Sequence, residues 1–158
     1  MPSVLIKELT KRNQTIVFAE SCTGGLLSSS LTSISGSSKV FQGSIVSYSN
    51  ELKNSLLNIS EEKLTKYGAV SEEVCEAMAI NVKEKLGADW AIAISGIAGP
   101  DGGSKDKPVG LVYISISGPN NHITNIKKLF NSTRNRVEIQ TLSAVSYTHL
   151  TLPTIGCV

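Results

Sequence analysis

The stretch Ala19-Glu20-Ser21-Cys22-Thr23-Gly24-Gly25 lies between a run typical of a strand and a run typical of a helix. Residues 15–19, before it, are β-branched, aromatic or small and carry no charge, which predicts a buried strand. After it, apolar residues recur at helical spacing as far as Ile34. The two glycines allow a tight turn and a close backbone approach by a ligand. The stretch therefore predicts a strand, a turn and a helix in succession.

The turn holds three adjacent side chains that are capable of nucleophilic attack, Ser21, Cys22 and Thr23. A helix that begins here would direct free N–H groups and the positive end of its dipole at an anion or a developing oxyanion. The same residues also suit an ordinary turn in which serine or threonine caps the helix, and such turns are common in α/β domains. The local sequence leaves both interpretations open.

Helix and strand patterns alternate along the rest of the chain. Helices are predicted over residues 3–12, 24–34, 60–67, 71–86 and 134–144, with a further short helix that opens at Asn50. Strands are predicted over residues 15–20, 40–49, 90–94, 109–117 and 123–130. This alternation, without an internal repeat or a linker, predicts a single three-layer α/β/α domain with a mixed, mostly parallel sheet.

The composition excludes several classes of protein. The chain has 158 residues, of which 41% are hydrophobic and 18% charged, with a net charge of +2. This length suits one domain with a substantial core, and the charge gives no electrostatic footprint for nucleic acid. No apolar run approaches the ~20 residues that cross a bilayer, and the first residues lack the pattern of a secretory signal. We expect a cytoplasmic protein with no nucleic-acid or membrane partner.

Cysteine and histidine are scarce. Cys22, Cys75 and Cys157 are odd in number and widely spaced, which supports neither a disulfide framework nor a zinc site. The two histidines are His122 and His149. A Ser-His-Asp triad or a histidine-rich metal centre would have to use one of these two.

The end of the chain departs from the pattern before it. From Val145 the helical spacing is lost, in the run Val145-Ser146-Tyr147-Thr148-His149-Leu150-Thr151-Leu152-Pro153-Thr154. This string resembles a read-through translation of a transposon-end sequencing adapter. We therefore interpret residues 1–144 as the domain and residues 145–158 as a non-native tail, with an ordinary frayed end as the alternative.

Two further stretches follow predicted strands. Val46-Ser47-Tyr48-Ser49-Asn50-Glu51-Leu52-Lys53 enters a helix, and Ser95-Gly96-Ile97-Ala98-Gly99-Pro100-Asp101-Gly102-Gly103 follows the apolar strand over residues 90–94. Because ligands of open α/β sheets bind at the carboxyl ends of strands, we expect the three turns to form one pocket. The glycine spacing matches neither the dinucleotide nor the phosphate-loop pattern. Its amides suit a phosphate, and a flexible surface loop is the alternative.

A serine nucleophile needs a base to take its proton. With so little histidine, a carboxylate or a lysine must serve, and burial readily shifts the pKa of a lysine. Lys53 follows an apolar strand and has leucines beside it, so Ser21 and Lys53 are a sensible pair; the alternative is a solvated helix lysine. Since side chains alternate at a strand end, only one of Ser21 and Cys22 faces the pocket, and the spacing does not say which.

Other residues are candidates for contact with a ligand. Arg134, near the start of the last predicted helix, suits a phosphate by charge and geometry, and a surface arginine is the alternative. Glu20 is interpreted as a polar neighbour that holds the turn in place. Asp101 is either a ligand contact or a solvated loop residue, and His122 is expected to be exposed beside a turn.

Four motifs follow one another along the chain. They are Ala19-Glu20-Ser21-Cys22-Thr23-Gly24-Gly25, Tyr48-Ser49-Asn50-Glu51-Leu52-Lys53, Tyr67-Gly68-Ala69-Val70-Ser71-Glu72-Glu73 and Ser95-Gly96-Ile97-Ala98-Gly99-Pro100-Asp101-Gly102-Gly103, with Lys107-Pro108-Val109-Gly110 after the last. In this order they resemble the C-terminal domain of the CinA competence/damage-inducible family. The similarity runs from about Leu5 to about Ala144, and the domain also occurs alone as a nicotinamide-nucleotide amidohydrolase.

The resemblance implies deamidation of nicotinamide mononucleotide to nicotinate mononucleotide and ammonia, without a metal or an organic cofactor. It implies that Ser21 is the nucleophile and Lys53 the base. It further implies substrate-binding positions, with backbone N–H groups of the first motif on the oxyanion and the glycine loop and last arginine on the ribose phosphate. These positions are Thr23, Gly24, Gly25, Tyr48, Gly96, Gly99 and Arg134.

The chain differs from the family pattern before its last helix. A Gly-Asp-Arg element is usual there, whereas this chain has Asn131-Ser132-Thr133-Arg134 and retains only the arginine. The family also suggests a homo-oligomer. Our leading hypothesis is a Ser/Lys amidohydrolase of pyridine nucleotide salvage. The alternatives are a non-catalytic nucleotide-binding module linked to competence or the DNA damage response, and a hydrolase that depends on Cys22.

Overall fold

A computed structural model describes residues 2–156 of the chain. Its five strands form one sheet in the order β2-β1-β3-β4-β5. β1 pairs in parallel with β2 and β3, whereas β4 is antiparallel to β3 and β5. The expected mixed sheet is confirmed. All strands except β4 point in one direction, although the pairings divide equally between parallel and antiparallel. The strands are β1 (Ile16–Glu20), β2 (Phe41–Val46), β3 (Trp90–Gly96), β4 (Leu111–Ser117) and β5 (Ile123–Leu129).

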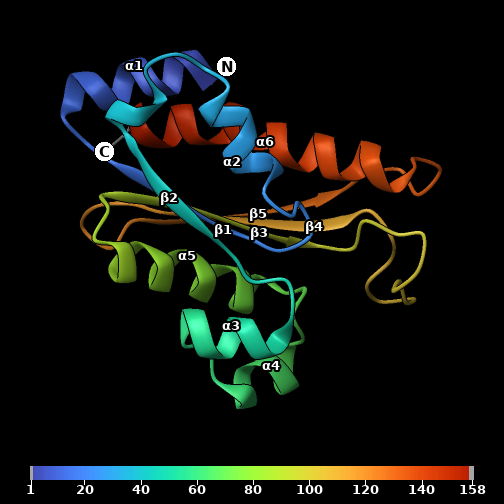
Figure 1. The fold of residues 1–158 in the computed structure, drawn as a ribbon. Coiled ribbons are helices and arrows are strands. Elements are labelled where there is room, and N and C mark those ends of the chain that lie inside the picture. Colours follow the sequence, from blue (N-terminus) through green and yellow to red (C-terminus); the bar gives the residue numbers. More distant parts are fainter. Residues whose placement is uncertain (1, 157–158) are drawn as a thin grey trace.

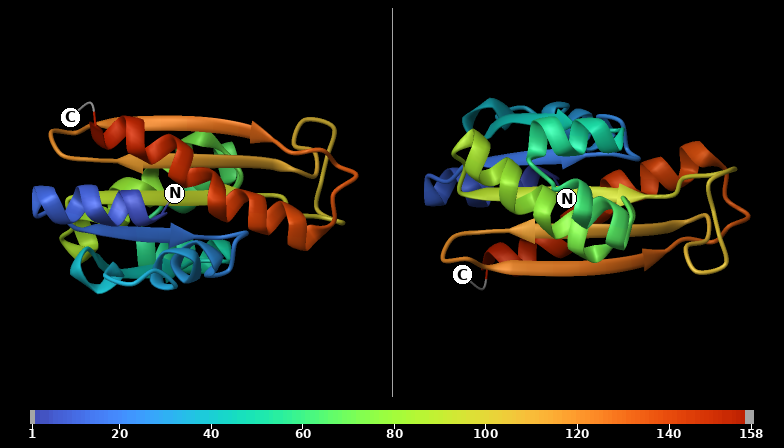
Figure 2. Two further views of the ribbon diagram at one scale, coloured as in Figure 1. Left: turned by 90° about the horizontal axis from the view of Figure 1, so that it is seen from above. Right: turned by 90° about the horizontal axis from the view of Figure 1, so that it is seen from below.

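Helices cover both faces of this sheet, which confirms the three-layer α/β/α arrangement (Figures 1 and 2). One face carries α1 (Pro2–Arg12), α2 (Leu26–Thr32) and α6 (Arg136–Gly156). The other carries α5 (Glu72–Leu86), with α3 (Asn50–Leu57) and α4 (Glu61–Tyr67) packed on its outer side. A short 3₁₀ helix, η1 (Ser37–Lys39), leads into β2.

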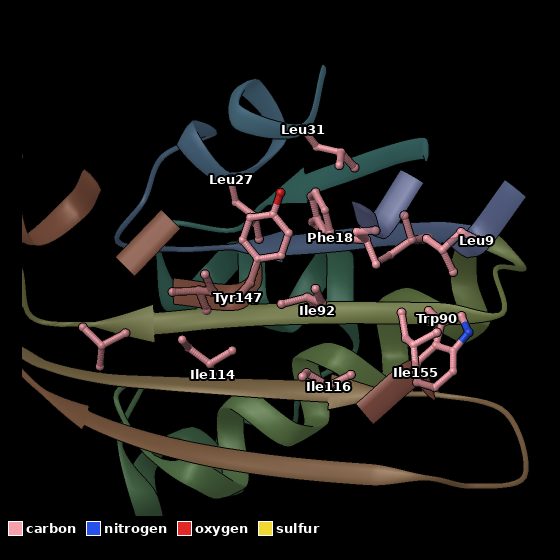
Figure 3. Packing of buried hydrophobic residues seen from close by; sticks show 14 of the residues in the cluster. Leu9, Phe18, Leu27, Leu31, Trp90, Ile92, Ile114, Ile116, Tyr147 and Ile155 are labelled. Atoms are coloured by element: carbon pink, nitrogen blue, oxygen red, sulfur yellow. The ribbon is translucent and has the colours of Figure 1, made fainter. Parts of the chain in front are cut away.

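Two apolar layers hold the domain together, one on each face of the sheet. The larger lies under α1, α2 and α6 and includes Phe18, Trp90 and Ile92 (Figure 3). The smaller lies under α5. Residues Trp90 to Ser95 of β3 are all buried. Helices on both faces explain why this strand is continuously apolar in sequence.

The last helix is longer than the sequence pattern predicted. It begins at Arg136 and continues to Gly156 instead of ending at residue 144. Tyr147, Thr151 and Ile155 are buried, and their spacing of four places them on one helix face. The Tyr147 ring lies 5.9 Å from that of Phe18 (Figure 3). Threonines and Pro153, which are unfavourable inside a helix, lie between these positions and obscure the periodicity.

The interpretation of residues 145–158 as a non-native tail concerns the origin of that sequence, and it stays a prediction. The part of it that falls on Cys157 and Val158 lies outside the described residues.

The register of the first three strands brings their carboxyl ends together. A bulge in β2 places Ser44 opposite Phe18 and Val46 opposite Glu20, and the Ser47 N–H then donates to the Glu20 carbonyl at 2.9 Å. The turns that leave β1, β2 and β3 therefore begin at the same edge of the sheet. In the chain from residue 2 to 156, no helix combines the length and apolarity that a membrane span needs.

Candidate active site

The three turns surround a cavity of about 230 Å³ at this edge of the sheet. Ser21 comes from the turn after β1, Tyr48 and Lys53 from the segment after β2, and Gly96 and Gly99 from the loop after β3. The expectation that the three stretches form one pocket is therefore met. A larger cavity, of about 390 Å³, lies between α3 and α4, and the described residues that line it include no serine, cysteine, lysine or histidine.

Ser21 and Lys53 are in direct contact although they lie on different elements. Lys53 Nζ donates to Ser21 Oγ at 3.0 Å, and also to the Ser47 carbonyl at 2.6 Å and the Tyr48 carbonyl at 3.3 Å. Ser49 caps α3 by accepting the Leu52 N–H at 3.1 Å. This cap begins the helix one turn before Lys53, so that the lysine side chain reaches back into the cavity.

The surroundings of Lys53 make its neutral form more accessible than that of a solvated lysine. Its side chain is 1% exposed, and burial lowers the pKa of Lys53 to about 8 against weaker, opposing contributions from Cys22 and Cys75. A neutral amine has two N–H donors and one lone pair. With the donors on the two carbonyls, the lone pair is left for the Ser21 hydroxyl. Lys53 is thus arranged to accept a proton from Ser21.

Cys22 is less suited to be the nucleophile. It lines the cavity but belongs to the apolar cluster and is 5% exposed. Burial raises the pKa of the Cys22 thiol to about 12, whereas the reactive form of cysteine is the thiolate. The expectation that only one of the two neighbours faces the pocket is wrong, because both line the cavity. The contact with Lys53 belongs to Ser21.

The N-terminus of α2 is occupied by the chain itself. The N–H groups of Gly25 and Leu27 donate to Glu20 Oε2, each at 3.0 Å, and the Gly24 N–H donates to the Ser21 carbonyl at 3.0 Å. The prediction that the Gly24 and Gly25 amides would hold an oxyanion is therefore wrong. Their positive φ angles, 56° and 106°, explain why the turn needs glycine.

The Thr23 side chain also lies away from the cavity. Its hydroxyl donates to Glu20 Oε2 at 2.6 Å and its side chain is 1% exposed. Thr23, Gly24 and Gly25 are absent from the lining of the described cavity. The three residues shape the turn that carries Ser21. The predicted contacts of the Gly24 and Gly25 amides are corrected accordingly, whereas a contact of the Thr23 N–H with an oxyanion stays a prediction.

Arg136, and not Arg134, reaches the cavity. Arg136 Nη1 donates to the Gly99 carbonyl at 2.7 Å, and its Nη2 donates to the Tyr48 hydroxyl at 2.6 Å. Arg134 lines a neighbouring cavity of about 520 Å³ that Arg136 also borders. The sequence pointed to Arg134 because the last helix was expected to begin there, whereas α6 begins two residues later, at Arg136. Basic residues at both positions were the signal available in the sequence.

The glycine loop lies close to its neighbours. A Cβ on Gly96 would stand 2.7 Å from the Leu111 carbonyl oxygen, so this position admits no side chain. Asp101 also lines the cavity. Tyr48, Gly96 and Gly99 are thus at the cavity, and their contact with a substrate stays a prediction.

The histidines lie elsewhere. His122 is half-buried, not exposed as expected, and its Nε2 lies 3.0 Å from Thr124 Oγ1 beside the Trp90 ring. Trp90 begins β3, at the end of the sheet opposite Ser21. Among the described residues, no three or more His, Cys, Asp or Glu side chains gather as ligands for a metal ion.

The whole fold has close counterparts among solved structures. A competence/damage inducible protein from Agrobacterium tumefaciens superposes with a TM-score of 0.93 at 34% identity, over 98% of this chain and 93% of that one. A competence or damage-inducible protein from Enterobacter asburiae superposes with a TM-score of 0.92 at 28% identity, over 98% and 95%.

The sequence gives a matching result. A CinA-like protein of Prochlorococcus marinus strain AS9601 is 94% identical over 90% of this chain, and one of Trichormus variabilis is 50% identical over 91%. This chain spans only 34% and 35% of the length of those two relatives. A family model described as the CinA C-terminal domain matches residues 1–150. The protein that carries Ser21 and Lys53 therefore belongs to the CinA C-terminal domain family.

Proposed function

We propose that this chain is an amidohydrolase in which Ser21 and Lys53 deamidate nicotinamide mononucleotide. The observation that carries the proposal is the 3.0 Å contact between Lys53 Nζ and Ser21 Oγ. The lysine is buried with a pKa lowered to about 8, so a minority of it, roughly one tenth at pH 7, is neutral and able to act as a base. A module that only binds nucleotide has no need of a serine paired with such a base.

The first half of the reaction forms an ester. Ser21 Oγ attacks the carboxamide carbon while the Lys53 amine takes the hydroxyl proton. The Lys53 ammonium then gives that proton to the departing nitrogen, so that ammonia leaves and a nicotinoyl ester remains on Ser21. In the turn of the described chain that carries Ser21, the Cys22 and Thr23 N–H groups donate to no other residue. We assign these two groups to the oxyanion.

The second half restores the serine. Neutral Lys53 takes a proton from water as the water oxygen attacks the ester carbon. Collapse of the intermediate breaks the bond to Ser21 Oγ, which receives the proton back from Lys53. The products are a carboxylic acid and the free enzyme, and the whole reaction consumes one water and releases one ammonia.

The choice of nicotinamide mononucleotide as substrate rests on the four motifs and on Arg136. The motifs resemble a family with members that deamidate this nucleotide, and a nucleotide brings a phosphate. A guanidinium suits a phosphate because it offers paired, charge-assisted donors. Arg136 stands between the cavity of Ser21 and the neighbouring cavity. We place the carboxamide beside Ser21 and the phosphate at Arg136.

The decisive test is ammonia release from nicotinamide mononucleotide by the purified chain. We expect stoichiometric formation of ammonia and nicotinate mononucleotide. A folded protein that binds the nucleotide, as seen by calorimetry, but releases no ammonia would instead be the non-catalytic nucleotide-binding module.

Activity should rise with pH through about 8. Burial lowers the pKa of Lys53 to about 8, and the neutral base is the productive form, so kcat/KM falls as the pH drops below that value. The measurement is kcat/KM from pH 6 to 10, with circular dichroism at each pH to show that the fold is unchanged. A rate that is flat across pH 7 to 9 contradicts the assignment of Lys53 as base.

Arg136→Ala should weaken binding of the phosphorylated substrate selectively. Loss of a charge-assisted contact of about 1.5–3 kcal/mol raises KM by roughly 10- to 150-fold. The KM for nicotinamide riboside, which lacks the phosphate, should rise far less. Arg134→Ala is the matched control, and it should stay near wild type. An equal rise in KM for both substrates would show that Arg136 does not bind the phosphate.

A further inference from the structure

Glu20 is a fully buried carboxylate directly before Ser21, with 0% exposure. Within the described residues it forms no salt bridge, since the ion pair found there joins Arg12 and Glu8. It is also absent from the lining of the cavity. A buried charge without a cation requires hydrogen-bond donors in its place.

Five such donors surround the Glu20 carboxylate. Oε2 accepts from the Thr23 hydroxyl at 2.6 Å and from the Gly25 and Leu27 N–H groups, each at 3.0 Å. Oε1 accepts from the Ser28 N–H at 2.9 Å and from the Ser28 hydroxyl at 2.5 Å. These groups belong to the turn after Ser21 and to the first turn of α2. Glu20 therefore caps that helix from the strand before it.

The donors match a carboxylate and not an amide. The first N–H groups of a helix have no partner within the helix and carry partial positive charge. A carboxylate is purely an acceptor, whereas the glutamine amide presents an –NH₂ group. Glutamine at this position would place that donor against N–H and O–H donors, and the turn would have to shift.

The backbone of Glu20 is also connected to Lys53, the proposed base, through Ser47. Its carbonyl accepts the Ser47 N–H at 2.9 Å, and the Ser47 carbonyl accepts from Lys53 Nζ at 2.6 Å. The Ser21 N–H donates in turn to the Ile94 carbonyl of β3 at 3.0 Å. Glu20 thus stands at the junction of the turn that carries Ser21 and the strand end that holds Lys53.

We propose that Glu20 is a positioning residue for the nucleophile: its buried carboxylate replaces a bound anion at the start of α2 and holds Ser21 Oγ against Lys53 Nζ. The inference rests on the proposed function for its kinetic readout. Removal of the carboxylate should lower kcat and leave KM near its wild-type value, because Glu20 holds the reacting atoms and no part of the cavity wall.

The test is Glu20→Gln, measured in two ways. The first is kcat and KM for ammonia release from nicotinamide mononucleotide. The second is the rate at which a fluorophosphonate, a reagent for activated serines, labels Ser21. A displacement of the nucleophile by about 1 Å costs roughly 100-fold, and we expect kcat and the labelling rate to fall together by that factor. If the wild-type protein is labelled but releases no ammonia, nicotinamide mononucleotide is not its substrate. The comparison of labelling rates between wild type and Glu20→Gln then still tests the positioning role.

Asp89→Asn is the matched control. Asp89 Oδ2 accepts from the Thr15 N–H at 2.8 Å and from its hydroxyl at 3.1 Å, before β3 at the opposite end of the sheet. The same carboxylate-to-amide change there should leave labelling and kcat at wild-type values. A folded Glu20→Gln that labels as fast as wild type overturns the proposal, and so does one that alters only KM.

Thr23→Val and Ser28→Ala keep the test available if Glu20→Gln does not fold. Each removes one hydroxyl donor to Glu20 and leaves the carboxylate and the N–H donors in place. We expect smaller losses of labelling rate and kcat than with Glu20→Gln, again at constant KM. Wild-type labelling in both variants would overturn the positioning role.

Discussion

Ser21→Ala should lower kcat for amide hydrolysis by about 10⁴-fold or more, with the fold intact, since loss of a serine nucleophile removes the covalent path altogether. Ser21 is 8% exposed and its hydroxyl contacts Lys53. Alanine deletes one oxygen and leaves Lys53 Nζ with the Ser47 and Tyr48 carbonyls. The measurement is ammonia release at saturating substrate, beside a thermal unfolding curve.

Cys22→Ala is the control that separates the two neighbouring nucleophiles. The Cys22 thiol lies in the apolar cluster and burial raises its pKa to about 12. Its removal should cost some stability through a small cavity and leave most of the activity. The reverse result, an inactive Cys22→Ala with an active Ser21→Ala, would select the cysteine-dependent hydrolase.

Lys53→Met should lower kcat by about 10²- to 10⁴-fold, the usual contribution of a general acid and base. Methionine has similar length and suits an apolar site, so the cavity wall is retained. The residual rate should lose its rise through pH 8, because the group that titrates there is gone. A variant that keeps the wild-type pH profile would show that another group is the base.

The same variant should change stability in a pH-dependent way. The pKa of Lys53 is lowered from 10.5 to about 8, which corresponds to about 3 kcal/mol against the charged form in the folded state. Between pH 8 and 10.5 the unfolded chain binds a proton that the folded chain does not, so wild-type stability gains from Lys53 as pH rises.

Lys53→Met lacks this gain. It should be at least as stable as wild type at pH 7 in urea unfolding, and its advantage should shrink as the pH rises to 10. Parallel stability curves for Lys53→Met and wild type would contradict the pKa of Lys53.

Local patterns predicted most of the elements because each depends on neighbouring residues. The strand before Ser21 and the helix after Ser71 were expected at nearly their observed bounds, and Ser71 caps that helix at 3.3 Å from the Val74 N–H. α6 was the exception. Its buried face recurs at Tyr147, Thr151 and Ile155, but threonines and Pro153 lie between these positions and are unfavourable inside a helix.

The site was predicted less completely than the fold. Ser21 and Lys53 were candidates from chemistry and resemblance, and their contact joins residues 32 apart in the chain. Arg136 was missed because two nearby arginines are equivalent until the start of α6 is known. The prediction of a free N-terminus for α2 was wrong because its N–H groups bind the Glu20 side chain, which belongs to the preceding strand.

The sequence by itself determined the alternation of helices and strands, the three turns at strand ends and the two residues able to form a serine–lysine pair. These depend on spacing and side-chain chemistry along a continuous chain. Only the tertiary structure decided that Ser21 rather than Cys22 meets Lys53, that Arg136 reaches the cavity and that Glu20 occupies the start of α2. The physical reason is that strand register and helix packing, set by long-range pairing and burial, determine which distant atoms come within hydrogen-bond distance.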